Sequence, residues 1–273
     1  MNEWQDWIGR ASSTTAWLDP AQANRMVATL DRTGAFRSGD ALPPAWHWLY
    51  FHDVARAADL GEDGHPALGV VMPPVPARRR MWAGGSMEFH APLLLGEIAE
   101  RRTTINAITP KQGRSGALWF VAVEHALHVG GRLALTETQT IVYRDAALEP
   151  SAQAPLAPNA ADYTARYTLD STALFRYSAL TFNGHRIHYD LEYCRTVEGY
   201  SNLVVHGPLI ATLLLDLYVQ QGAPLRRFEY RARSPLCLPD ALTVCGTAQE
   251  GGAALWARDD AGRLLMEATA LAE

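Results

Sequence analysis

The sequence predicts an α+β fold in which one structural unit, a helix covered by an antiparallel sheet, occurs twice. A glycine-arginine-leucine turn occurs once in each half of the chain, at Gly131–Leu133 and at Gly262–Leu264. Glu88 and Glu229, each followed by an aromatic residue, recur at nearly the same separation as these turns. Alternating apolar and polar residues, which are typical of half-buried strands, flank both turns. Because these features recur in one order at a nearly constant offset, we expect a duplicated chain.

Three strands are predicted in each half, and short turns join them into antiparallel pairs. In chain order they are Arg101–Ile108, Ala117–Leu127, Leu133–Tyr143, Ala241–Thr247, Ala253–Ala257 and Leu264–Leu271. Since the two sets follow the same order, we expect an equivalent antiparallel sheet in each half.

A helix precedes the strands in each half. In the second half, Pro208 lies in the first turn, leucines continue to Leu217, and Gly222 lies beyond the end. Because leucine covers more than one face, we expect a sheet to wrap around this helix. Its counterpart in the first half is predicted at Pro44–Ala58. A helix wrapped by a curved antiparallel sheet, present twice, is a double hotdog.

A segment rich in proline and alanine separates the halves. Pro150, Pro155 and Pro158 interrupt both helix and strand in this segment. We therefore expect an N-terminal repeat over residues 1–146, a linker over residues 147–162 and a C-terminal repeat over residues 163–273.

The composition is typical of a soluble globular protein, with 48% hydrophobic and 19% charged residues among 273. A net charge of −5 argues against general attraction to nucleic acid or to anionic membranes. The three cysteines have no metal-type spacing and no secretory signal is visible, so we expect a cytoplasmic protein without a metal site. The sequence also lacks a nucleotide-binding glycine loop and a Gly-x-Ser-x-Gly motif.

The stretch Asn183–Asp190 is the part of the sequence that points to chemistry. Its first residue carries an amide that can orient water, and His188 can exchange a proton near neutral pH. Gly207 then begins the long helix, where an unpaired backbone amide could hold a developing oxyanion. An amide, a base and an anion hole are what the addition of water beside a thioester carbonyl requires.

These residues resemble the MaoC-like hydratase family of hotdog proteins. That family has Asp-x-Asn-Pro-Ile/Leu-His where this chain has Asn183 to His188, followed by Asp190 and by a His-Gly pair at the helix. The closer likeness is to the branch of mesaconyl-C4-CoA hydratases, itaconyl-CoA hydratases and fatty-acid-synthase-like dehydratases. It is carried by Arg79–Gly85, Phe182–Asp190, Glu198–Tyr200 and Leu203–Leu209.

The resemblance implies a hydro-lyase that reversibly hydrates a short enoyl-CoA such as mesaconyl-C4-CoA or itaconyl-CoA. It implies no cofactor other than the coenzyme A of the substrate. Asn183 replaces the family's aspartate and cannot take a proton, so His188 is expected to be the single acid and base. Asn183 would hold the water, and the Gly207 amide would stabilise the enolate. The alternative for Asn183 is a turn residue, and the alternative for His188 is a structural histidine. The alternative for Gly207 is a residue that only permits a tight entry into the helix.

Seven further residues are predicted to contact the substrate: Tyr177, His185, Arg186, Val205, His206, Arg79 and Arg80. Arg186 could pair with a distal carboxylate of the acyl group, because a guanidinium binds carboxylates through two hydrogen bonds. An ion pair with Asp190 or Glu192 is the alternative. The neighbouring arginines could meet coenzyme A phosphates or the same carboxylate, or lie on a solvated surface.

The first half has no equivalent of Asn183 and His188, so we expect one active site per chain, walled by the first half. A homodimer is expected, without nucleic-acid or membrane partners. Two other functions stay open from the sequence. An acyl-CoA thioesterase would use the same fold, and a catalytically silent acyl-CoA-binding subunit would explain the asparagine.

Overall fold

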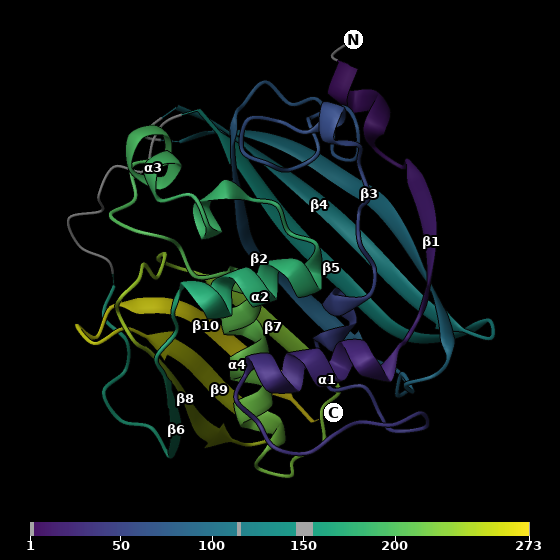
Figure 1. Ribbon diagram of the computed structural model, residues 1–273, viewed down its shortest axis with the longest axis vertical. Helices are drawn as coiled ribbons and strands as arrows, with labels where there is room; N and C mark the ends of the chain where they lie inside the picture. Colours follow the sequence, from purple (N-terminus) through teal and green to yellow (C-terminus); the bar gives the residue numbers. More distant parts are fainter. Residues whose placement is uncertain (1–2, 114–115, 146–154, 273) are drawn as a thin grey trace.

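The computed structural model describes residues 3–113, 116–145 and 155–272 (Figure 1). Its strands form one sheet in the order β1-β3-β4-β5-β2-β7-β10-β9-β8-β6. The order is symmetric about the β2–β7 pair, so β1 to β5 repeat as β6 to β10. The strands are β1 Ala11–Trp17, β2 Arg79–Phe89, β3 Ile98–Gly113, β4 Gly116–Val129, β5 Arg132–Arg144, β6 Tyr163–Tyr167, β7 Arg227–Ala232, β8 Leu242–Gln249, β9 Gly252–Arg258 and β10 Leu264–Leu271. The predicted α+β double hotdog is confirmed.

The two repeats also share their strand pairing. β2 pairs Phe89 with Leu135, and β7 pairs Ala232 with Met266. Leu135 and Met266 have the same separation in the chain as the two glycine-arginine-leucine turns, so the predicted offset holds for β5 and β10. For β2 and β7 the match of Glu88 to Glu229 is wrong. The equivalent positions are Phe89 and Ala232, and their separation in the chain is slightly larger than that of Glu88 and Glu229. The discrepancy is an even number of residues, which keeps every side chain on its face, so alternation alone could not detect it.

Helix α4 (Gly207–Val219) is the predicted helix of the second repeat, and its residues Leu209 to Tyr218 are all buried. Gly222, beyond the end, has a φ of +73°, which is the left-handed conformation that favours glycine. The leucines of α4 belong to one hydrophobic core that also contains Trp46 and Met87 of the first repeat. The repeats therefore share a core.

The predicted first-repeat helix over Pro44–Ala58 is wrong. This segment contains only two 3-10 turns, η2 (Trp46–Leu49) and η3 (Ala57–Asp59). His47 Nε2 and Trp48 Nε1 each lie 2.9 Å from a carboxylate oxygen of the buried Glu137. Adjacent side chains of an α-helix point in different directions and could not readily share one carboxylate. The preceding Ala45 has a left-handed φ of 66°, which also interrupts a helix.

Two further helices, which the sequence did not predict, lie side by side. α1 (Pro20–Thr29) and α2 (Ser171–Thr181) pack against each other (Figure 1). Each begins at an aspartate, Asp19 or Asp170, whose carboxylate accepts a backbone N–H of the first turn. α2 is followed by the short helical turns η4 (Arg186–His188), α3 (Leu191–Tyr193) and η5 (Cys194–Glu198).

The predicted linker is described only in part. Residues 147–154 lie outside the described residues, whereas Leu156 bridges to Arg263 and Leu264 N donates to Pro155 O at 2.8 Å. This described end of the linker therefore follows the start of β10. No helix among the described residues is long and apolar enough to cross a membrane.

Candidate active site

A cavity of about 760 Å³ is lined by residues of both repeats. The predicted site residues on its wall are Tyr177, Asn183, His185, His188, Val205, Gly207 and Arg80. Three predicted residues, Arg79, Arg186 and His206, are not among those that line it. The segment after α2 and the start of α4 thus meet at one cavity.

His188 has the hydrogen-bonding arrangement of a base. Its Nδ1 lies 2.7 Å from the carbonyl oxygen of Val204, which can only accept. The proton of the neutral ring therefore resides on Nδ1, and Nε2 keeps its lone pair. Burial lowers the pKa of His188 to about 3, so the ring is neutral at physiological pH.

His206 lies behind His188 and supports it. The two rings stack with their centroids 3.5 Å apart, and His206 Nε2 lies 2.8 Å from Ser178 Oγ. Tyr177 packs edge-on against the same ring at 4.9 Å. Burial, reinforced by His188, holds the pKa of His206 well below its ordinary value. His206 is the N-cap residue of α4.

Asn183 closes a turn and faces the cavity. It follows Phe182, which ends α2 with a left-handed φ of 52°. Asn183 Oδ1 accepts the backbone N–H of His185 at 3.0 Å. With the oxygen engaged, the Nδ2 group is the part of the amide that can donate to a water. The turn and the water-holding interpretations are therefore compatible.

Gly207 begins α4, and no side chain of the described residues caps this helix end. Helix N-termini carry partial positive charge, so the amides here suit a developing anion. A Cβ at Gly207 would lie 2.9 Å from Cε3 of Trp82. Glycine therefore also allows the Trp82 ring to lie against the start of the helix.

Two of the predicted arginines are held in ion pairs. Arg186 Nη2 lies 2.7 Å from Asp190 Oδ2, and its guanidinium lies over the Tyr193 ring at 4.3 Å. Arg79 Nε lies 3.3 Å from Glu198 Oε2. Neither side chain is among those that line the cavity: the Asp190 carboxylate, four residues along, pairs with Arg186, and the Glu198 carboxylate of the second repeat pairs with Arg79. Their contact with substrate stays a prediction. Arg80, one residue along β2, does line the cavity.

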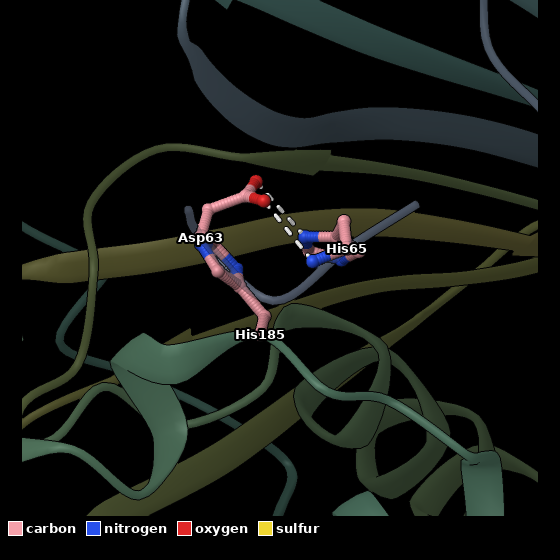
Figure 2. Close-up of side chains that lie close together, drawn as sticks. All are labelled: Asp63, His65 and His185. Atoms are coloured by element: carbon pink, nitrogen blue, oxygen red, sulfur yellow. Dashed lines mark hydrogen bonds and ion pairs between the residues drawn. The ribbon is translucent and has the colours of Figure 1, made fainter. Parts of the chain in front are cut away.

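Two further side chains that the sequence did not predict, Asp63 and His65, lie in the loop before β2, and His65 lines the cavity. This loop crosses to the second repeat, where Arg186 N donates to Asp63 O at 2.9 Å. The rings of His65 and His185 are 4.4 Å apart, and Figure 2 shows both imidazoles beside the Asp63 carboxylate. The local sequence Asp-Gly-His-Pro indicates a turn, but it does not indicate which distant segment this turn contacts.

The hydroxyacyl-thioester dehydratase type 2 family matches residues 45–238 of the chain. The chain belongs to this family. Mesaconyl-C(4)-CoA hydratase of Chloroflexus aurantiacus is 43% identical over 238 residues, which cover 86% of the chain and 85% of that relative. The mitochondrial hydroxyacyl-thioester dehydratase type 2 of Schizosaccharomyces pombe is 29% identical over 235 residues, covering 75% of the chain and 77% of that relative.

Solved structures agree on the fold of this dehydratase-family chain. A MaoC-like dehydratase from Phytophthora capsici has a TM-score of 0.75 at 12% identity and covers 100% of the chain and 98% of its own. At that identity the likeness concerns the fold alone. The predicted MaoC-like resemblance and the hydro-lyase class are confirmed by the family and its relatives.

One group of side chains in this dehydratase-family site has the composition of a metal site. Donor atoms of Asp63, His65 and His185 lie within 4.8 Å of one another. The Asp63 carboxylate already accepts His65 N at 3.0 Å and lies 3.2 Å from His65 Nδ1. The expectation that the protein holds no metal stays a prediction.

Proposed function

We propose that the protein catalyses the reversible addition of water to a short enoyl-CoA, with mesaconyl-C4-CoA as its leading substrate and itaconyl-CoA as a second candidate. The observation that carries the proposal is the buried His188, which holds its Nδ1 against a carbonyl and lines the same cavity as Gly207 at the start of α4. The 43% identity to a mesaconyl-C(4)-CoA hydratase supports the choice of substrate.

In the proposed reaction, His188 Nε2 takes a proton from a water that Asn183 orients. The water oxygen bonds to C3 of the acyl group, and the C2=C3 electron pair moves toward the thioester as an enolate. The Gly207 amide stabilises the enolate oxygen, for which one such donor is worth about 2.7–4 kcal/mol of barrier in other enzymes. A proton then adds at C2 to complete the hydration.

We further propose that the reaction needs no cofactor beyond the coenzyme A of the substrate. The negative net charge of −5 supports a protein that acts without nucleic acid or a membrane surface. A cytoplasmic homodimer is the proposed state.

The test is to incubate the purified protein with mesaconyl-C4-CoA, itaconyl-CoA, crotonyl-CoA and saturated butyryl-CoA. We expect an unsaturated thioester to gain the mass of one water and to lose the absorbance of the conjugated thioester. Free thiol from butyryl-CoA would instead indicate a thioesterase. Tight binding without turnover of any of the four would indicate a silent binding subunit.

A further inference from the structure

Backbone carbonyls of the loop at residues 61–66 accept hydrogen bonds from the segment Asn183–Asp190. Arg186 N donates to Asp63 O at 2.9 Å, and Arg186 Nη1 donates to Glu62 O at 3.1 Å. A Cβ at Gly64, whose φ is +86°, would lie 2.0 Å from Gly184 O. A Cβ at Gly184 would lie 2.7 Å from Gly64 O. Gly64 and Gly184 therefore let the two backbones approach closely, and this approach together with the two Arg186 hydrogen bonds fixes the position of the loop.

This contact brings an aspartate–histidine pair to the cavity. His65 Nδ1 lies 3.2 Å from Asp63 Oδ2, and the carboxylate also accepts His65 N at 3.0 Å. The carboxylate orients the ring and directs its proton to Nδ1, so Nε2 is the free nitrogen. His65 lines the same cavity as His188, and the His185 ring contacts both, with its centroid 4.4 Å from that of His65 and 5.5 Å from that of His188.

The charged surroundings of His65 and His188 differ. Burial lowers the pKa of both, and Arg80 lowers that of His65 further, but Asp63 and Asp53 raise the pKa of His65. His188 faces a neutral carbonyl and has no such carboxylate. Two titratable groups in one cavity with different charge partners suit an acid and a base. The histidine with the carboxylate is the one better able to hold a positive charge.

We propose that His65, oriented by Asp63, is a second catalytic residue that delivers the proton to C2 in the hydration and removes it in the dehydration. The inference rests on the proposed function. As His188 takes the proton of water, the imidazolium of His65 gives its Nε2 proton to C2, so one histidine gains the proton that the other loses. Release from His188 to solvent and uptake by His65 restore both rings. The first repeat thus supplies chemistry as well as a wall.

The experiment measures hydration and dehydration by His65→Gln, His65→Ala and Asp63→Asn in the full chain. For His65→Gln we expect kcat to fall by about 10²–10⁴-fold, the usual contribution of a general acid or base, with a small change in KM. Deuterium at C2 of the hydroxyacyl-CoA should slow dehydration more strongly than in wild type, because proton transfer becomes limiting. Added imidazole should restore part of the His65→Ala rate.

Asp63→Asn should lower kcat less than His65→Gln and should also raise the deuterium effect, since it disturbs only the orientation of the ring. His90→Gln is the matched control, because His90 is exposed and bonds to Thr136 Oγ1 outside this cavity. Unchanged thermal unfolding of the variants shows that they are folded.

Three outcomes would overturn the inference. One is a His65→Gln rate within about threefold of wild type, well below a general acid–base contribution. The second is a lower rate with an unchanged deuterium effect and no rescue by imidazole, which indicates a structural role. The third is a stoichiometric divalent metal whose removal by a chelator abolishes activity, which assigns the cluster to metal binding. A wild-type protein that hydrates none of the enoyl-CoAs contradicts the proposed function instead.

Discussion

The proposed role of His188 as the base depends on one backbone carbonyl. Val204 O engages Nδ1, and burial keeps the ring neutral, so the lone pair on Nε2 is available to a water. The stacked His206 ring holds the imidazole from behind, at a centroid distance of 3.5 Å. Because its pKa is lowered to about 3, the ring stays in its neutral form across the physiological pH range.

Replacing His188 with glutamine should lower kcat for hydration by about 10²–10⁴-fold, because the amide cannot take the proton of water. Steady-state rates on the best substrate of the panel test this. His128→Gln serves as the control, since His128 lies on β4 and is not among the residues that line the cavity. If the two variants retain similar rates, another group is the base.

At the same scale, the sequence predicted the residues of a local motif but not their distant partners. Asn183 and His188 lie in one short segment, so the sequence alone could suggest their proposed shared role. Asp63 belongs to the other repeat and is far from Asn183 in the chain. Contact between their segments depends on how the first-repeat loop crosses the second repeat. For Arg186, the alternative ion pair with Asp190 was open from the sequence, and it is the one that forms.

The helices show how far periodicity reaches. α4 was predictable because its leucines, its proline and the glycine beyond it are all local signals. The segment at Trp46–Leu49 is also rich in hydrophobic residues. It forms a 3-10 turn, in which both His47 and Trp48 hydrogen-bond to the buried Glu137 on β5. A polar partner on another strand therefore overrode the local preference.

Asp216 on α4 provides a prediction about pH and stability. Burial raises the pKa of the Asp216 carboxyl to about 6, although Arg32 at 2.8 Å lowers it. A group whose pKa is higher in the folded chain stabilises the fold below its unfolded pKa and loses that contribution as pH rises through its folded pKa. From pH 5 to pH 8, wild type should therefore lose about 1–2 kcal/mol of unfolding free energy relative to Asp216→Asn.

Urea unfolding of both proteins at the two pH values measures this difference. Asp31→Asn is the control, because Asp31 is exposed on the loop after α1 and lies outside the buried environment of Asp216. A constant difference between wild type and Asp216→Asn would mean that the carboxyl has the same pKa in both states.

For the whole molecule, the β2–β7 pair joins the repeats, and glycine makes the close approach there possible. A Cβ at Gly85 would lie 2.3 Å from Thr138 O and 2.4 Å from Tyr230 Oη. We expect Gly85→Ala to lower the free energy of unfolding by about 1–3 kcal/mol, the usual cost of overpacking. Ser86→Ala, on the next residue of β2, should change it by less than about 0.5 kcal/mol. Equal stability of the two variants in urea would contradict this account.

The duplicated sheet, three consecutive strands of each half, the helix α4 and the Asn183–His188 segment could be read from local signals, whereas the strands β1, β2, β6 and β7 were not predicted. Alternation indicates strands, leucine periodicity indicates a helix and glycine indicates turns, because each of these patterns depends on only a few neighbouring residues. The register between β2 and β7, the partners of Arg79 and Arg186, and the arrival of Asp63 and His65 at the cavity depended on the folded chain. Each of these is decided by how separate segments pack in the folded chain, and no local pattern encodes which distant surface a loop will meet.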